Sequence, residues 1–448
     1  MIALNPYEDI IAYETELLAY KLDVKTRGVW LECGKLIRKR GIAIVISVVK
    51  LHMKPLLDRI LPVLSAQRVP FVMVKDSLIH HYTNMGGYGG RMVGHIFTFY
   101  TDNNDDLILL LKHIVSLTVD LKGPVVRDAL QLSQSVFVFK YELIRDKNGQ
   151  RHKQLSRPAE MPMLEELRIK QPLKYIPQKA FVRKLYFNVR TIKSSPKGNI
   201  YSVRSLMHLG RKLIIKQGNL NMVDDYDGRT IRDRLLWQKR VLSDLHGKLS
   251  LPKPIDFFEI SGDSYLVLSF INAECLDYRI KNVYKKGGWN TLSSDAKQII
   301  LNYFVKVLKQ IALLHDNGYV HRDIKHDNLM ITVADEPVLL DFELSWSLRD
   351  KYPNPPFLVK SPGYQAPEQL QLREPSVKED VYSCGALLFY LLSGEHPKCI
   401  NEQRDIGNLF NIGVAPEFTK LIKECMSADP NDRPEIKQIL HRINIHQL

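Results

Sequence analysis

The residues of this sequence that could do chemistry are concentrated between positions 321 and 343. Asp323 and Asn328 share one short segment, HRDIKHDNLM, and Asp341 follows the apolar run PVLL. Phosphoryl transfer requires a metal ion that neutralises the phosphates and a group that orients or deprotonates the attacking hydroxyl. We therefore expect Asp323 to act on a substrate hydroxyl, and Asn328 and Asp341 to bind Mg²⁺ together with ATP.

Further motifs follow in the order found in eukaryotic-type protein kinases, which residues 181–448 resemble. The resemblance implies that Lys325 neutralises the transferring phosphate, as in serine/threonine kinases. It implies that Ser361 of SPGYQAPE lies beside the candidate base. It also implies two supports for the site, an ion pair between Glu368 and Arg433 and a brace from Asp380 to the loop that carries the base.

The resemblance also implies a nucleotide site. Lys216 ends the apolar run LIIK, where a kinase lysine contacts the α- and β-phosphates. Its partner in the next helix is a glutamate in the family and Gln238 here. A neutral amide holds an ammonium group less strongly than a carboxylate does.

The rest of the expected nucleotide site departs from the family in one place. The phosphate-covering loop, residues 191–203, has a single glycine, Gly198, where the family has three. Glycines let the backbone approach phosphates closely. We expect the segment from Ser269 to Ile271 to form the hinge and Met330 to form an apolar floor under the nucleotide.

A further departure lies at Glu343, because the family has glycine after Asp-Phe at this position. Glycine adopts backbone conformations that other residues disfavour, so we expect Glu343 to restrict this corner. Together with Gln238 and the single-glycine loop, Glu343 keeps open the alternative of a pseudokinase scaffold without activity.

Composition limits the class of protein. The chain has 448 residues, enough for two or three domains, with 45% hydrophobic and 25% charged residues. No apolar run reaches transmembrane length, and we expect a cytoplasmic protein with no membrane partner. A formal net charge of +14 favours anionic ligands, while no nucleic-acid motif is present. The five cysteines lack CxxC spacing, so we expect reduced thiols.

The first 150 residues alternate short strand and helix patterns, which predicts a small α/β or α+β domain. Residues 151–180 are charged and contain scattered proline, so we expect a linker. The pattern from 181 onward predicts a bilobal kinase fold with an N-lobe at 181–270 and a C-lobe at 271–448. The expected fold class is therefore α+β overall, a kinase fold preceded by a small α/β domain.

The order of segments resembles class III lanthipeptide synthetases, which carry a DFE-like motif. They join a phospho-Ser/Thr lyase, a kinase and a cyclase. GIAIVISVV (41–49) resembles the lyase strand that carries a Lys and a His for proton transfer, and this chain has Ala43 and Val45 at those positions. Neither side chain can transfer a proton. We expect an inactive lyase-like domain and no cyclase.

Other basic residues of this half have two interpretations. His80, His81, His95, Lys75 and Arg91 are either solvated loop residues or members of an anion-binding site.

The function that this sequence predicts is Mg²⁺/ATP-dependent phosphorylation of serine or threonine in a peptide or protein, within ribosomal peptide modification. Two alternatives stay open. One is a bifunctional kinase-lyase that forms dehydroamino acids. The other is the scaffold, whose partner would be a separate lyase or cyclase.

Overall fold

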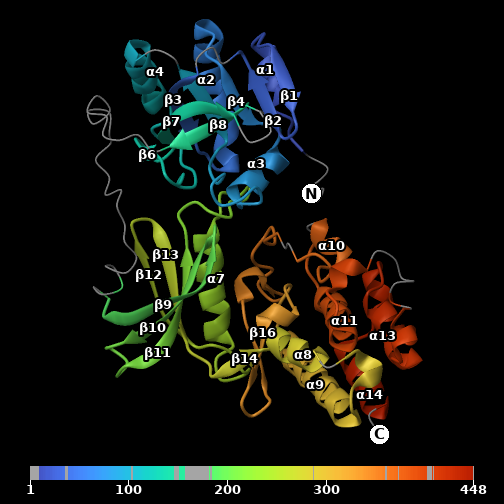
Figure 1. Cartoon of the computed structure of the whole chain (residues 1–448). Helices are drawn as coiled ribbons and strands as arrows, with labels where there is room; N and C mark the ends of the chain where they lie inside the picture. Colours follow the sequence, from blue (N-terminus) through green and yellow to red (C-terminus); the bar gives the residue numbers. More distant parts are fainter. Residues whose placement is uncertain are drawn as a thin grey trace. The chain divides into compact units, whose positions relative to one another are not determined.

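The chain forms two compact units (Figure 1). One comprises residues 236–256 and 268–448, and the other comprises 10–235 and 257–267. Both contain helices and strands, so the predicted mixed class is confirmed. The computed structural model describes residues 10–35, 39–101, 104–145, 151–156, 181, 184–285, 287–358, 361–371, 373–400, 406 and 408–446.

An antiparallel sheet dominates the N-terminal domain, with strand order β1-β2-β4-β5-β3-β7-β6 and β8 paired to β7. Its strands are β1 Val24–Arg27, β2 Trp30–Cys33, β3 Arg40–Ile46, β4 Phe71–Val74, β5 Phe97–Thr101, β6 Leu130–Gln131, β7 Val136–Arg145 and β8 Arg151–Ser156. Its helices are α1 Glu14–Ala19, η1 Lys50–His52, α2 Met53–Gln67, α3 Ser77–Asn84 and α4 Asn104–Leu117. Antiparallel pairing makes this domain α+β.

Strand β8 lies in the range predicted as linker, and its pairing with β7 extends the sheet beyond residue 150. Residues 157–180 of the predicted linker lie outside the described residues.

The two faces of the sheet have different roles, which is clearest at β3. Successive side chains of a strand point to opposite faces. Ile42, Ile44 and Ile46 belong to the core that the sheet shares with α2 and α4. Ala43 and Val45 belong to a second apolar cluster on the other face. Positions 43 and 45, where the lyase that this half resembles has its Lys and His, therefore lie on the sheet face away from these helices.

A second, five-stranded sheet has the order β12-β13-β11-β10-β9. Its strands are β9 Tyr186–Ser195, β10 Gly198–Ser205, β11 Arg211–Gly218, β12 Pro254–Ile260 and β13 Asp263–Ser269, and helix α7 spans Ile231–Asp244.

Polar side chains between β11 and α7 connect this sheet to the N-terminal domain within one compact unit. The Asp224 carboxylate accepts a hydrogen bond from the Lys50 backbone N–H at 2.6 Å. The Asn221 amide donates to the Gly123 carbonyl at 3.0 Å. Both side chains are buried, so they satisfy backbone groups that water would otherwise solvate.

The other unit is mostly helical. Helix α9 packs against α11 and α14, and α11 packs against α13. Ser376 caps the N-terminus of α11, and Gly394 ends this helix with φ +74°. The elements of this unit are β14 Ala273–Cys275, α8 Leu276–Tyr284, η2 Trp289–Thr291, α9 Ser294–Asp316, β15 Tyr319–Val320, η3 His326–Asn328, β16 Leu329–Thr332, β17 Pro337–Leu339, η4 Phe342–Leu344, β18 Trp346–Ser347, α10 Pro367–Leu370, α11 Val377–Ser393, η5 Pro397–Cys399, η6 Asn408–Ile412, α13 Pro416–Cys425, η7 Pro430–Asp432 and α14 Ile436–His446.

Within the ranges that the structure describes, none of the helices has the length and apolar character needed to cross a membrane.

Candidate active site

The loop that carries Asp323 is held by a buried carboxylate on α11. Asp380 accepts hydrogen bonds from two successive backbone N–H groups, those of His321 and Arg322, each at 2.8 Å. It also contacts the His315 ring at 2.9 Å. Burial alone would raise the pKa of Asp380, but these hydrogen bonds hold it below its ordinary value. The predicted brace is confirmed.

Three side chains converge on the Asp323 carboxylate. The Lys325 ammonium donates to both carboxylate oxygens, at 2.9 and 2.7 Å. The Ser361 hydroxyl donates to Oδ1 at 2.5 Å and accepts from Lys325 at 2.9 Å, so its predicted place beside Asp323 is confirmed. Asn328 donates through Nδ2 to Asp323 Oδ2 at 2.8 Å. The carboxylate is therefore held in a fixed orientation, and the residue is 5% exposed.

Asp341 follows β17 and has a left-handed backbone, with φ +63° and ψ +63°. Arg322 also has positive φ, at +68°. Such conformations cost roughly 1–3 kcal/mol in residues other than glycine, and they concentrate at functional sites. The loop is tied to Asn328, whose carbonyl accepts from the Leu340 N–H at 2.9 Å.

The backbone at Glu343 has a conformation that residues other than glycine adopt. Glu343 lies buried within η4 and is not among the residues with positive φ. The left-handed residue of this corner is Asp341, so the backbone does not require a glycine two residues later.

A second support is the ion pair between Glu368 and Arg433. The guanidinium donates to both carboxylate oxygens, at 2.5 and 2.9 Å, and the Arg433 side chain is fully buried. Arg433 also donates to the carbonyls of Ser427 and Lys378. The predicted pair is confirmed, and it ties the segment after Ser361 to the end of the domain.

The predicted nucleotide-contacting residues of this unit occupy several elements. Ser269 ends β13, and its hydroxyl accepts from the Lys253 N–H at 2.9 Å while its own N–H donates to the Lys253 carbonyl. Ile271 follows in the connection to β14, and Met330 lies in β16, both half-buried. Gln238 lies buried in α7. Their contacts with a nucleotide remain predictions.

Lys216 and Gly198 belong to the other compact unit, so the pairing of Lys216 with Gln238 also remains a prediction. Lys216 lies in β11, opposite Ile200 of β10. The expected phosphate-covering loop is a tight hairpin, in which Ser195 of β9 pairs with Gly198 of β10. Only Pro196 and Lys197 form its turn.

Gly198 is required by a close backbone contact. Its φ is +148°, and a Cβ at this position would lie 1.9 Å from the Gln217 carbonyl oxygen. We expect Gly198→Ala to destabilise the fold by more than about 1 kcal/mol, because the backbone must move. Gly210→Ala is the matched control, since Gly210 has φ +74° and no atom near its Cβ position. Thermal melting should show the larger loss for Gly198→Ala; equal losses would contradict the contact.

The face of the N-terminal sheet that carries Ala43 and Val45 is apolar. Both side chains are fully buried and cluster with Phe137, Phe139 and Tyr100. This surrounding favours neither charge nor proton transfer.

The three histidines of this set are not solvated, which corrects the first interpretation for them, and the lowered pKa of two of them weakens the second. His80, His81 and His95 are buried. Burial lowers the pKa of His80, and it lowers the pKa of His95 to about 4. The Lys75 ammonium nitrogen lies 3.9 Å from the Asp76 carboxylate oxygen Oδ2. Arg91 is exposed, as the first interpretation expects.

The neutral state of His95 predicts a pH dependence of stability. Its pKa is about 4 in the folded chain against an ordinary 6.5, so the unfolded chain binds the proton more readily. The stabilisation is complete above pH 6.5 and is lost as pH falls toward 4, by roughly 3 kcal/mol. We expect His95→Gln to flatten urea-derived stability over this range, whereas exposed His113→Gln should not. Parallel pH profiles for wild type and His95→Gln would contradict this.

A recess of about 460 Å³ opens on the β9–β10–β11 sheet and was not found from the sequence. Arg190, Arg204 and Lys212 contribute to its lining. These three residues come from three strands, and only strand register brings them together.

Comparison with known proteins gives two matches. Residues 240–443 match the protein kinase domain, and residues 12–165 match the RamC N-terminal domain. One relative is a protein of Acanthamoeba polyphaga mimivirus that is named as a serine/threonine-protein kinase. It is 34% identical to this chain, and the match covers 32% of this chain and 56% of the viral protein. The serine/threonine-protein kinases shk1/pak1 of Schizosaccharomyces pombe and PknA of Nostoc are 26% and 25% identical over 57% and 55% of this chain.

The chain spans about half or less of the length of these relatives, namely 56%, 38% and 44%. The matched ranges follow the architecture described above. The chain therefore carries a small N-terminal sheet domain followed by a C-terminal protein kinase domain.

Proposed function

We propose that this chain is a Mg²⁺/ATP-dependent serine/threonine kinase that phosphorylates a peptide or protein. The observation that carries the proposal is the network in which Lys325, Ser361 and Asn328 all bond to Asp323. A carboxylate held in this way can orient a substrate hydroxyl and take its proton. The matches to serine/threonine kinases support this reaction class.

The residues proposed to hold Mg²⁺ fit that ion chemically. Mg²⁺ prefers oxygen ligands, and it neutralises the phosphates of bound ATP. Asn328 turns its amide nitrogen toward Asp323, so its carbonyl oxygen is the atom that remains for a metal. Asp341, whose backbone is left-handed, would supply the second oxygen donor. Lys325 contributes positive charge beside the reacting hydroxyl.

For the N-terminal domain we propose a binding role in ribosomal peptide modification of the lanthipeptide type. Elimination of phosphate requires a base for the Cα proton and an acid for the leaving phosphate. The buried apolar surroundings of Ala43 and Val45 offer neither. The domain would bind substrate or phosphorylated product, and a separate lyase or cyclase would complete the modification.

A second candidate is a bifunctional kinase-lyase, which the match to the RamC N-terminal domain favours. It requires acid–base residues other than positions 43 and 45.

Mass spectrometry of serine- and threonine-containing peptides, incubated with the full chain and Mg²⁺-ATP, separates these functions. A stable gain of phosphate supports a kinase without elimination, and loss of water supports the bifunctional enzyme. Asp341→Asn should abolish either product, because it removes a proposed metal ligand. If peptides and general protein substrates all stay unmodified, and Mg²⁺-ATP does not shift thermal melting, the kinase proposal is wrong and a scaffold remains.

A further inference from the structure

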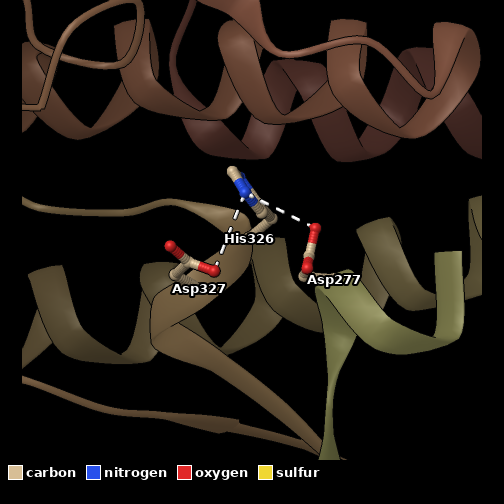
Figure 2. A group of neighbouring side chains, drawn as sticks. All are labelled: Asp277, His326 and Asp327. Carbon is tan, nitrogen blue, oxygen red and sulfur yellow. Dashed lines mark ion pairs between the residues drawn. The ribbon is translucent and has the colours of Figure 1, made fainter. Parts of the chain in front are cut away.

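Among the described residues, one group of side chains brings three metal-ligand atoms together (Figure 2). Asp277 lies in the first turn of α8, and His326 and Asp327 lie in η3. His326 Nε2 lies 3.6 Å from Asp277 Oδ1 and 3.8 Å from Asp327 Oδ1. All three donor atoms lie within 4.8 Å of one another. The proposed phosphoryl transfer uses none of these side chains.

The His326 ring is fixed so that Nε2 faces the carboxylates. Its other nitrogen, Nδ1, lies 2.6 Å from the Tyr364 hydroxyl, and the ring stacks on Tyr390 with centroids 4.3 Å apart. The residue is 7% exposed. No hydrogen bond to Nε2 is formed by any described residue, since both carboxylate contacts exceed 3.5 Å. Nε2 therefore faces two carboxylates and forms no hydrogen bond with a described residue.

The second nitrogen of the ring is held as in a metal-bound histidine. Metal-bound histidines hold their second nitrogen with a hydrogen bond, which fixes the tautomer. The Tyr364 hydroxyl can accept from Nδ1–H, and the lone pair of Nε2 then points between the carboxylates.

The two carboxylates differ in how firmly they are held: Asp277 is fixed by hydrogen bonds, and Asp327 is exposed. The Tyr390 hydroxyl donates to Asp277 Oδ1 at 2.6 Å, and Lys281 donates to Oδ2 at 2.7 Å. The Asp327 side chain is 56% exposed, so it can rotate and it opens the group to solvent.

We propose that Asp277, His326 and Asp327 bind a divalent transition-metal ion, with Zn²⁺ as the test ion. Donor atoms of a tetrahedral zinc site lie roughly 3.3 Å apart, given zinc–ligand distances of about 2.0–2.1 Å. The observed separations of 3.6 and 3.8 Å require only small movements. The nitrogen donor favours zinc over Mg²⁺, which prefers oxygen alone.

Metal binding at this position would link two parts of the kinase domain. His326 and Asp327 lie between Asp323 and Asn328 in the same loop, while Asp277 begins α8. A bound ion would fix the loop to the helix and would neutralise the two acids beside the candidate active site.

Isothermal titration of the chelator-treated full chain with ZnCl₂, in excess Mg²⁺, tests the proposal without any phosphoryl transfer. We expect one saturable site in the wild type. Asp327→Asn should weaken it by at least about 100-fold, because a ligand is lost. Tyr390→Phe should weaken it by about 10- to 100-fold, because the hydroxyl only orients Asp277.

Two controls locate the ion. Asp316→Asn replaces an exposed aspartate at the end of α9, and Asp341→Asn alters the proposed Mg²⁺ site; both should bind zinc as the wild type does. Because Asp327 is exposed, its variant should fold, which circular dichroism verifies. Absence of saturable zinc binding, binding that survives Asp327→Asn, or binding lost in Asp341→Asn would each overturn the proposal. The proposal would also be overturned if the chain binds no zinc but binds a basic peptide through Asp277 and Asp327.

Discussion

An Asp323→Asn variant should lose kcat for peptide phosphorylation by about 10²- to 10⁴-fold, the usual contribution of a positioned acid or base. Asparagine keeps the shape of the side chain but cannot take the proton of the substrate hydroxyl. It also presents an amide nitrogen to the Lys325 and Ser361 donors, so part of the network is lost. Affinity for Mg²⁺-ATP should stay close to that of the wild type, because Asp341 is unchanged.

Steady-state kinetics with varied peptide and varied ATP separate these two effects. Asp316→Asn is a matched control, since it makes the same substitution at an exposed aspartate and should retain wild-type kcat. Circular dichroism of both variants tests whether the fold is kept. A kcat for Asp323→Asn equal to that of the wild type would show that this carboxylate takes no part in the transfer.

The supports around Asp323 were predictable because the resemblance to protein kinases implies them. Asp380 lies in the first turn of α11, where the helix begins and its carboxylate meets the loop N–H groups. Glu368 and Arg433 are a buried pair, and a buried charge requires an opposite partner. The motifs show which residues correspond to the family's supports, and the structure shows the contacts.

Contacts set by strand pairing or by burial were not predictable from local pattern. Asp277 and His326 are far apart in the chain, and they meet because β14 pairs with β16, where Cys275 lies opposite Met330. His95 is buried where its ring packs against Phe139. The hydrophobic pattern along the sequence does not predict this contact. The positive φ at Asp341 was likewise not predictable from the DFE motif.

The largest expected loss of stability follows from Arg433→Met. The substitution leaves the Glu368 carboxylate buried at 6% exposure without its cation, which costs about 3–5 kcal/mol. We expect this decrease in the free energy of unfolding from urea denaturation of the full chain. Arg349→Met is the control, because that side chain is 77% exposed and its contact with Asp350 contributes less than about 1 kcal/mol.

The double variant Arg433→Met with Glu368→Gln separates the cost of the unpaired charge from other contacts of Arg433. Removing the negative charge should restore part of the stability, because a neutral amide is less costly to bury. The carbonyls of Ser427 and Lys378 still lose their donor, so a deficit of roughly 1–3 kcal/mol should remain. A double variant as unstable as Arg433→Met alone would show that packing and carbonyl contacts, and not the ion pair, account for the stabilisation.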